Sequence, residues 1–338
     1  MAETTRRWVL ASRPEGKPTE GEFELEESEV PDPGSDEVLV RTIYLSVDPY
    51  MRGRMRDAES YAEPWEPGDV MRAGAVGEVI ESNHPGFEAG DVAFGNLYWA
   101  EYATAKGNQL THVDPELAPI STALGVLGMP GRTAYFGTLD VAEPEPGDTM
   151  VVSGAAGAVG SVAGQLGKLS GARVVGIAGS EEKIDWLTDE LGFDAGVNYR
   201  EEDVSEALEE VCPDGVDVYY DNVGGEITDA VFDRLNVRAR VAVCGQIALY
   251  NAEERPTGPR KLGKLIETRA CVEGLLVRDF ESRYEEANER LARWVNEGVI
   301  EYEETITEGF ENAPAAFIGL FEGENVGKQL VAVGEHGG

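Results

Sequence analysis

The chain has 338 residues, of which 42% are hydrophobic, and its 64 Asp and Glu against 28 Lys and Arg give a formal net charge of −36. This length and apolar fraction are enough for two domains with buried cores, and they exclude a disordered chain. The negative charge excludes nucleic acids and anionic membranes as partners, because their phosphate groups would be repelled. The acidic residues are scattered along the chain, as in proteins that live in molar salt, so we expect a halophilic source.

Three cysteines, Cys212, Cys244 and Cys271, show no close pairing, which predicts buried thiols in a reducing compartment. No segment approaches the about 20 apolar residues that span a bilayer. Residues 4–10 contain two arginines before an apolar run, like a twin-arginine export signal. The run ends at Ala11, short of the about 7–15 residues that such a signal needs. We therefore predict a first strand here and a cytoplasmic protein.

Residues 1–124 predict a β-rich domain. Turn signals at residues 31–34 and 84–86 separate short alternating runs, and no helix-period segment of any length precedes Thr122. This pattern favours a small barrel-like β domain. The predicted strands are residues 8–10, 23–26, 38–43, 75–80 and 91–94.

An apolar run that breaks into glycines follows, and it predicts the first half of a dinucleotide site. Residues 150–152 read as a buried parallel strand, and residues 161–170 have the spacing of a helix that packs back on it. Gly154 would let the strand turn sharply, Gly157 would let the backbone approach a pyrophosphate, and Gly160 would let the helix lie close to the sheet. The pyrophosphate would face the N-terminal end of that helix.

The segments after the glycine turn continue the alternation of strand and helix, which predicts a doubly wound parallel sheet over residues 125–302. The alternative is a glycine-rich turn in an α/β domain that binds no dinucleotide. Residues 303–338 return to the first domain and close with a strand at 329–333. The predicted elements are strands at 173–178, 195–198, 216–220 and 239–244, with helices at 183–191, 202–211 and 284–297.

The end of the second strand indicates which dinucleotide binds. An NAD site places Asp or Glu there to accept a hydrogen bond from the ribose 2′-OH. This chain has Gly179, Ser180 and then Lys183, which suit a 2′-phosphate, so the sequence predicts NADP(H). The alternative is that Lys183 pairs with Glu181 or Glu182 on a solvated helix.

Several segments in this order resemble the medium-chain dehydrogenase/reductase superfamily, in particular its zinc-free branch of prostaglandin, alkenal double-bond and curcumin reductases. The resemblance implies a GroES-like β-barrel domain over residues 1–124, a Rossmann domain over 125–302, and commonly a homodimer formed through sheet edges. It also implies NADPH-dependent reduction of the C=C bond of α,β-unsaturated ketones or aldehydes. The segments are residues 45–55 (LSVDPYMRGRM), 125–135 (GVLGMPGRTAY), the glycine turn, 221–225 (DNVGG), 244–251 (CGQIALYN), 308–314 (EGFENAP) and 323–328 (GENVGK).

Three other functions stay open. They are an NADPH:quinone oxidoreductase of the same superfamily, a non-catalytic NADPH-binding protein and, as the weakest, a zinc alcohol dehydrogenase. Zinc needs clustered Cys, His and acidic ligands. The three histidines are scattered, and Asp48, Pro49 and Tyr50 stand where zinc alcohol dehydrogenases carry a cysteine. We therefore expect no metal.

Tyr250 is the candidate catalytic residue. It follows a predicted strand end, where Rossmann ligands lie, and its hydroxyl is suited to stabilise negative charge on the substrate carbonyl oxygen. Packing on the cofactor is the alternative role. Glu267 occupies the position where plant and mammalian relatives have a tyrosine, so that residue's role cannot be transferred to this chain. Tyr50 and Tyr61 are candidate substrate residues.

The resemblance also assigns the cofactor contacts. Asn222 is placed near the nicotinamide ribose, although a turn asparagine is its alternative role. Asn325 would come from the tail to complete a cleft between the domains. The remaining residues are Ala156, Gly157, Ala158, Val159 and Gly160 at the pyrophosphate, Gly179, Ser180, Lys183 and Tyr199 at the 2′-phosphate, and Cys244, Gly245, Gln246, Ile247, Tyr250, Leu275, Leu276 and Val277 beside the nicotinamide.

Overall fold

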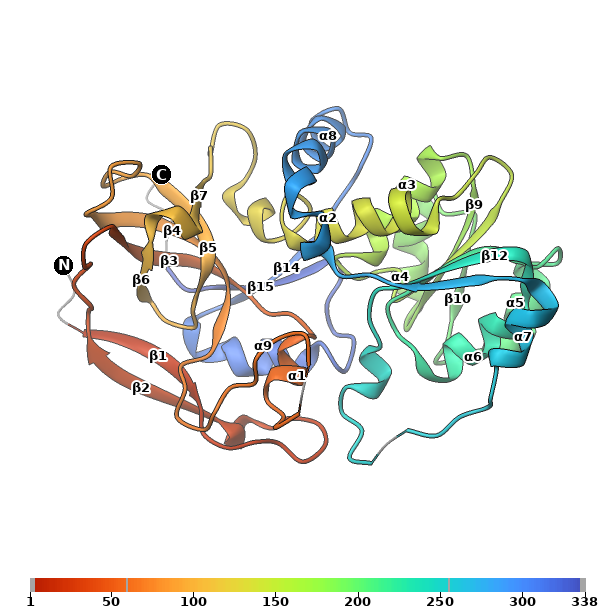
Figure 1. The fold of residues 1–338 in the computed structure, drawn as a ribbon, viewed down its shortest axis with the longest axis horizontal. Helices are drawn as coiled ribbons and strands as arrows, with labels where there is room; N and C mark the ends of the chain where they lie inside the picture. The colour runs from red at the N-terminus through yellow and green to blue at the C-terminus, as the bar shows by residue number, and fades with distance from the viewer. Residues whose placement is uncertain (1–3, 59, 255, 335–338) are drawn as a thin grey trace. The chain divides into compact units, whose positions relative to one another are not determined.

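The computed structural model describes residues 4–58, 60–254 and 256–334, and these divide into two compact units. The first unit comprises the described parts of Met1–Leu124, Glu304–Asn325 and Gln329–Gly338. The second comprises those of Gly125–Glu303 and Val326–Lys328. The chain therefore leaves the first unit after Leu124, returns to it at Glu304, and contributes Val326–Lys328 to the second unit before it ends in the first (Figure 1).

The second unit is built on a parallel sheet of six strands in the order β10-β9-β8-β11-β12-β13. This is the strand order of the doubly wound dinucleotide-binding fold, and the order reverses between β8 and β11. The predicted fold class is therefore confirmed. The strands are β8 (Thr149–Ser153), β9 (Arg173–Ala178), β10 (Ala195–Asn198), β11 (Val216–Asp221), β12 (Leu235–Val243) and β13 (Cys271–Gly274).

Helices cover both faces of this sheet (Figure 1), because the apolar strand residues alternate between two cores. In β8, Met150 and Val152 belong to one core, while Val151 belongs to the other. The helices are α2 (Met129–Phe136), α3 (Gly160–Leu169), α4 (Glu181–Asp185), α5 (Val204–Val211), α6 (Gly225–Asp233), α7 (Leu262–Thr268) and α8 (Tyr284–Asn296). Shorter or irregular turns are η4 (Gly137–Ala142), η5 (Trp186–Glu190), η6 (Ile247–Leu249) and η7 (Val277–Arg283).

The first unit is β-rich, as the sequence predicts. Its larger sheet has the order β14-β15-β3-β4-β5-β7, with β6 paired to β3, and β1 and β2 form a separate antiparallel pair. The strands are β1 (Thr4–Leu10), β2 (Phe23–Glu29), β3 (Glu37–Ser46), β4 (Arg72–Ser82), β5 (Val92–Tyr98), β6 (Tyr102–Lys106), β7 (Leu110–His112), β14 (Glu304–Glu308) and β15 (Lys328–Ala332). The short helical segments are η1 (Glu20–Glu22), α1 (Met51–Arg54), η2 (Gly107–Gln109), η3 (Ile120–Leu124), η8 (Phe310–Asn312) and α9 (Ala313–Gly319).

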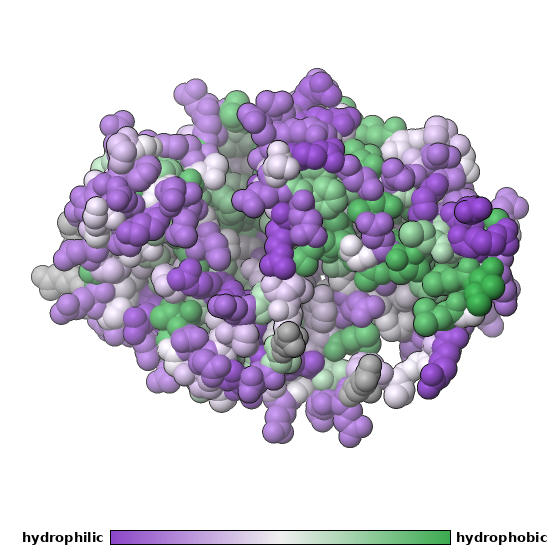
Figure 2. All heavy atoms as spheres, viewed as in Figure 1, coloured by the Kyte–Doolittle hydropathy of each residue, from purple (hydrophilic) through white to green (hydrophobic). Residues whose placement is uncertain are grey.

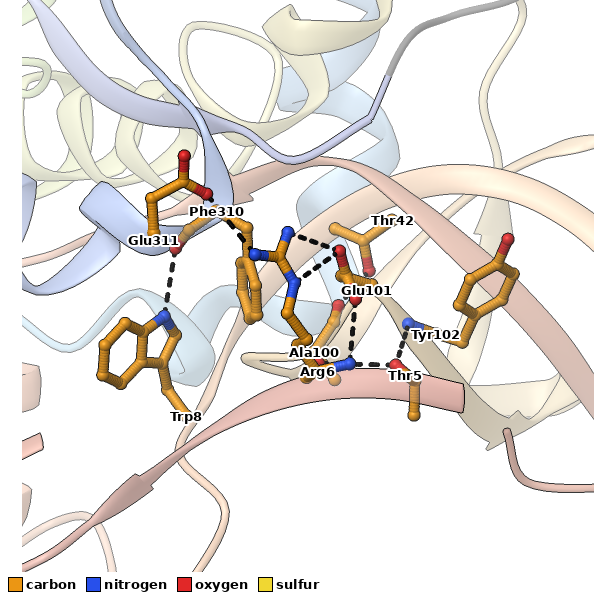
Figure 3. Close-up of polar contacts among 9 residues, drawn as sticks. All are labelled: Thr5, Arg6, Trp8, Thr42, Ala100, Glu101, Tyr102, Phe310 and Glu311. Carbon is orange, nitrogen blue, oxygen red and sulfur yellow. Dashed lines mark hydrogen bonds and ion pairs between the residues drawn. The ribbon is translucent and has the colours of Figure 1, made fainter. Parts of the chain in front are cut away.

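The returning segment is attached to the first strand of the chain (Figure 3). The buried indole Nε1–H of Trp8 donates to the Phe310 carbonyl oxygen at 3.0 Å. The Arg6 guanidinium donates to Glu101 at 2.8 Å and lies 3.6 Å from Glu311. The arginine pair of residues 4–10 is thus part of a strand, as predicted, and its side chains are used for packing and ion pairs.

The cysteines depart from the prediction. Cys212 is buried and Cys244 is partly buried, but Cys271 is exposed, so the expectation of three buried thiols is wrong for Cys271. The reason is its place in β13, which forms the edge of the six-stranded sheet and is exposed along its length. No helix among the described residues is long and apolar enough to cross a membrane.

Candidate active site

The glycine turn lies at the carboxyl end of β8. Gly154 has φ +58°, which glycine adopts without strain. A Cβ on Gly160 would come within 2.3 Å of the Gly154 carbonyl oxygen, so only glycine lets α3 begin this close to the turn. Gly154 and Gly160 therefore have the structural roles that the sequence predicts. A Cβ on Gly157 would meet the Gly154 carbonyl oxygen at 3.3 Å and no other atom within 4 Å.

The N-terminus of α3 has the features of a phosphate site. Val159 occupies the N-cap position, and its apolar side chain accepts from none of the first N–H groups of the helix, of which Ser161 N–H donates to the Gly157 carbonyl oxygen at 3.0 Å. The tail passes beside this turn, since Gly327 N–H donates to the Ala156 carbonyl oxygen at 2.8 Å. Gly327 has φ +64°, and a Cβ there would lie 1.9 Å from the Glu303 carbonyl oxygen. The tail residue that contacts the turn is therefore Gly327, two positions after Asn325.

The predicted 2′-phosphate residues gather where β9 and β10 end. Ser180 caps α4 by accepting from Lys183 N–H at 3.4 Å, and a Cβ on Gly179 would lie 2.9 Å from the Tyr199 hydroxyl oxygen. Burial lowers the pKa of Lys183, and the nearby positive charge of Arg200 lowers it further. Glu182 has a smaller effect in the opposite direction, so the predicted alternative partner of Lys183 is also close.

Arg200 was missed by the sequence analysis. It directly follows Tyr199, and its guanidinium carbon lies 5.9 Å from the centre of the Tyr199 ring. The signal was available, because a cation just after the third strand lies at the same sheet edge as the end of the second strand. Two cations that repel each other beside a hydroxyl and an aromatic ring are suited to a doubly charged phosphate.

Asn222 joins the ends of β8 and β11. Its Nδ2 donates to the Ser153 carbonyl oxygen at 2.8 Å, and its backbone N–H donates to Ser153 Oγ at 3.0 Å. The side-chain nitrogen therefore holds the sheet edge together, and the side-chain oxygen is the atom that can accept from a ribose hydroxyl.

The segment after β12 is attached to the same edge. Cys244 N–H donates to the Asp221 carbonyl oxygen at 2.8 Å, and Gly245 N–H donates to it at 3.1 Å. The Tyr250 hydroxyl oxygen accepts from Gln246 N–H at 3.2 Å, which leaves its own proton for another acceptor. Burial is the main cause that raises the pKa of Tyr250, so the phenol stays protonated at neutral pH. Leu275, Leu276 and Val277 follow β13, where Leu275 N–H donates to Val243 O at 2.9 Å.

The other candidates belong to the first unit. Tyr50 precedes α1 and is partly buried, and burial together with the charge of Asp48 raises its pKa. Tyr61 is 54% exposed and is close enough to raise the pKa of Tyr50 further. Asn325 belongs to this unit as well.

Glu267 is exposed on α7, 3.6 Å from Lys264, so it lies in a surface ion pair. Among the residues that the structure describes, no group of three or more His, Cys, Asp or Glu side chains could hold a metal ion.

Known proteins share both units of this chain. Residues 6–113 match the family described as the N-terminal domain of oxidoreductase, and residues 158–293 match the zinc-binding dehydrogenase family. The NADPH-dependent curcumin reductase of Escherichia coli is 47% identical, over 98% of this chain and 97% of that protein. The NADP⁺-dependent 2-alkenal reductase of Nicotiana tabacum is 42% identical, over 98% of this chain and 99% of that protein. The crystal structure of CurA from Vibrio vulnificus in complex with NADPH has a TM-score of 0.94 at 46% identity, over 98% of this chain and 100% of that one.

Proposed function

We propose that this chain reduces the C=C bond of α,β-unsaturated ketones or aldehydes with NADPH. It belongs to the medium-chain dehydrogenase/reductase superfamily and, within it, to the branch of NADP-dependent curcumin and 2-alkenal reductases. The observation that carries the proposal is the gathering of the glycine turn, Asn222 and Tyr250 at one edge of the second unit's sheet. These residues come from β8, β11 and the segment after β12, where the doubly wound fold binds its ligands.

The residues fit NADP(H). The N-terminal end of α3 would bind the pyrophosphate, and the side-chain oxygen of Asn222 would bind the nicotinamide ribose. Lys183, Tyr199 and Arg200 would bind the 2′-phosphate, because a half-buried ammonium and a guanidinium both favour a dianion. We propose that residues 125–302 form the cofactor domain and residues 1–124, with 303–338, the substrate domain. Asn325 and the residues after β13 would complete the nicotinamide side.

When bound, NADPH supplies a hydride. Hydride addition to the β-carbon of an enone places negative charge on the carbonyl oxygen. Tyr250 can donate a hydrogen bond to that oxygen and keep its proton, because its phenol is neutral and its oxygen already accepts from Gln246 N–H. Tyr50 and Tyr61 would contact the substrate from the first unit. The α-carbon then takes its proton from a hydroxyl group or water.

We further propose that this chemistry needs no zinc. One matching family is described as zinc-binding, so the question is open to measurement. The side chains support the proposal: Asp48 is buried and accepts from Ser46 Oγ, and in the second unit Cys212 is buried in an apolar core. Metal analysis of the purified protein that found one zinc per chain would contradict it.

The first experiment follows NADPH oxidation in multimolar KCl with a long-chain 2-alkenal or curcumin, and identifies the product by mass spectrometry. The matching saturated alcohol with NADP⁺ is the control. Saturation of the C=C bond without alcohol oxidation supports the proposal. Turnover of quinones alone would favour the quinone oxidoreductase, and NADPH binding without any turnover would favour a non-catalytic protein.

We propose a cytoplasmic homodimer from a halophile. The edge strand β13 and the neighbouring α7 carry exposed apolar residues, and Figure 2 shows hydrophobic atoms on this part of the second unit. A second copy that paired with β13 would cover them. Light scattering should give twice the 36.5 kDa chain mass, and Ile266→Glu should give monomers. The exposed apolar residues are Leu262, Ile266 and Val272.

A further inference from the structure

Asp221, the last residue of β11, has a fully buried carboxylate. A buried charge is costly unless hydrogen bonds compensate it, and here every donor is a neutral group. Four of the donors converge on a single oxygen atom, Oδ1. The donors to Oδ1 are Ser153 Oγ (3.1 Å), Tyr219 OH (2.9 Å), Val223 N–H (3.0 Å) and Gly224 N–H (2.9 Å), and Thr228 Oγ1 donates to Oδ2 (2.8 Å).

These donors come from the segments that carry the proposed cofactor contacts. Ser153 immediately precedes the glycine turn, and its Oγ also accepts from Asn222 N–H at 3.0 Å. Val223 and Gly224 form the turn into α6, where Gly224 has φ +73°. The carboxylate thus fixes the residue before the glycine turn and the two residues after Asn222. Asn222 lies between these anchor points.

We propose that Asp221 is a positioning residue whose buried carboxylate holds Asn222 and the start of the glycine turn in the arrangement that binds the nicotinamide half of NADPH. This inference rests on the function proposed above. A carboxylate suits the position and an amide does not, because Asp221 accepts through both of its oxygens, whereas the side chain of Asn has one acceptor oxygen and an NH₂ group that can only donate. In Asp221→Asn, some of these donors would lose their acceptor, and the turn after β11 would no longer be fixed.

The adenosine end of the site provides an internal reference. Ser180, Lys183, Tyr199 and Arg200 lie at the ends of β9 and β10, outside the group of donors to Asp221. Adenosine 2′-monophosphate contains that end of the cofactor and lacks both the pyrophosphate, which faces the glycine turn, and the nicotinamide half. A positioning role therefore predicts a loss of NADPH affinity without a matching loss of affinity for the monophosphate.

The experiment titrates both ligands into wild type and Asp221→Asn. We expect Asp221→Asn to weaken NADPH binding about tenfold, which corresponds to about 1.4 kcal/mol, and to change the binding of adenosine 2′-monophosphate by less than about twofold. Asp217→Asn is the matched control at the other end of β11, where the carboxylate accepts from Thr149 N–H and Asn236 Nδ2, both at 2.9 Å. It should leave both affinities unchanged even where it lowers the melting temperature.

A folded Asp221→Asn that binds NADPH as wild type does, or that loses both ligands equally, overturns the proposal. If Asp221→Asn does not fold, Thr228→Val removes the donor to Oδ2, together with the 3.0 Å contact between Thr228 Oγ1 and the Tyr219 hydroxyl, and leaves the four donors to Oδ1 in place. It should weaken NADPH binding alone, by about threefold. An unchanged NADPH affinity in that variant then overturns the proposal. Failure of the wild type to bind NADPH would instead refute the proposed function, so the two failures are distinguishable.

Discussion

Preference for NADPH over NADH should depend on Lys183 and Arg200. A hydrogen bond to a charged group contributes about 1.5–3 kcal/mol, which corresponds to about 10- to 150-fold in affinity. Lys183→Ala should weaken NADPH binding by that factor and leave NADH binding unchanged, because NADH has no 2′-phosphate. Arg200→Ala should cost less, about three- to tenfold, because removing its charge also relieves the repulsion that lowers the pKa of Lys183.

The pKa of Lys183 gives this prediction a second, pH-dependent test. Because the pKa is lowered in the folded protein, the ammonium loses its proton at a lower pH than an ordinary lysine does. NADPH affinity should therefore fall on the alkaline side before the ordinary lysine value of 10.5 is reached, and Arg200→Ala should move that fall to higher pH. NADH affinity should show no such fall at alkaline pH.

Isothermal titration with both cofactors measures these affinities, in molar KCl to match the proposed habitat. Lys168→Ala is the matched control, since this lysine lies in the same unit and pairs with Asp194 at 2.6 Å. An unchanged NADPH-to-NADH ratio in Lys183→Ala would refute the reasoning. An equal loss of both cofactors would refute it too, because Lys183 would then act on the fold and not on the 2′-phosphate.

Three further predictions concern single side chains. Tyr250→Phe should lower kcat about 100- to 1,000-fold with little change in NADPH affinity, as expected for loss of one oxyanion donor, and wild-type kcat should stay independent of this phenol through neutral pH because its pKa is raised. Gly160→Ala should lower stability by about 1–3 kcal/mol in urea unfolding, whereas Gly263→Ala, in open space on α7, should raise it by about 0.5–1 kcal/mol. Trp8→Phe leaves the buried Phe310 carbonyl oxygen without its donor and should cost about 1–3 kcal/mol, and a wild-type unfolding midpoint would show that this bond is dispensable.

The sequence was sufficient for the order along the chain of the strands from β8 to β12, because each of them has buried apolar residues, and for α3, α5 and α8, whereas α2, α6, α7 and β13 were not predicted. Residues 173–178 and 195–198 match β9 and β10 at both ends. Boundaries were less exact where capping decided them. The helix predicted to start at Lys183 starts at Glu181, because the Ser180 side chain accepts from Lys183 N–H and fixes the first turn before it.

The edge strand β13 and the exposure of Cys271 were not predictable in the same way. A four-residue strand has too little periodicity to indicate a face, and its exposure depends on its being last in the sheet order. Strand order arises from contacts between residues far apart in the chain, so local patterns do not contain it.

Because local patterns do not contain long-range contacts, some residues of the site were predicted and others were missed. Glycines, Asn222 and Tyr250 are visible in the sequence because each lies next to a strand end, where position alone suggests a ligand. Asp221 also lies at a strand end, but its importance comes from Ser153, 68 positions earlier in the chain, and from Thr228 in the next helix. A buried acid in a chain with 64 acids has no local signature, and only the convergence of neutral donors on one oxygen distinguishes it from the solvated carboxylates. Asp217, at the opposite end of the same strand, shows why residue type and strand position alone do not identify a positioning residue.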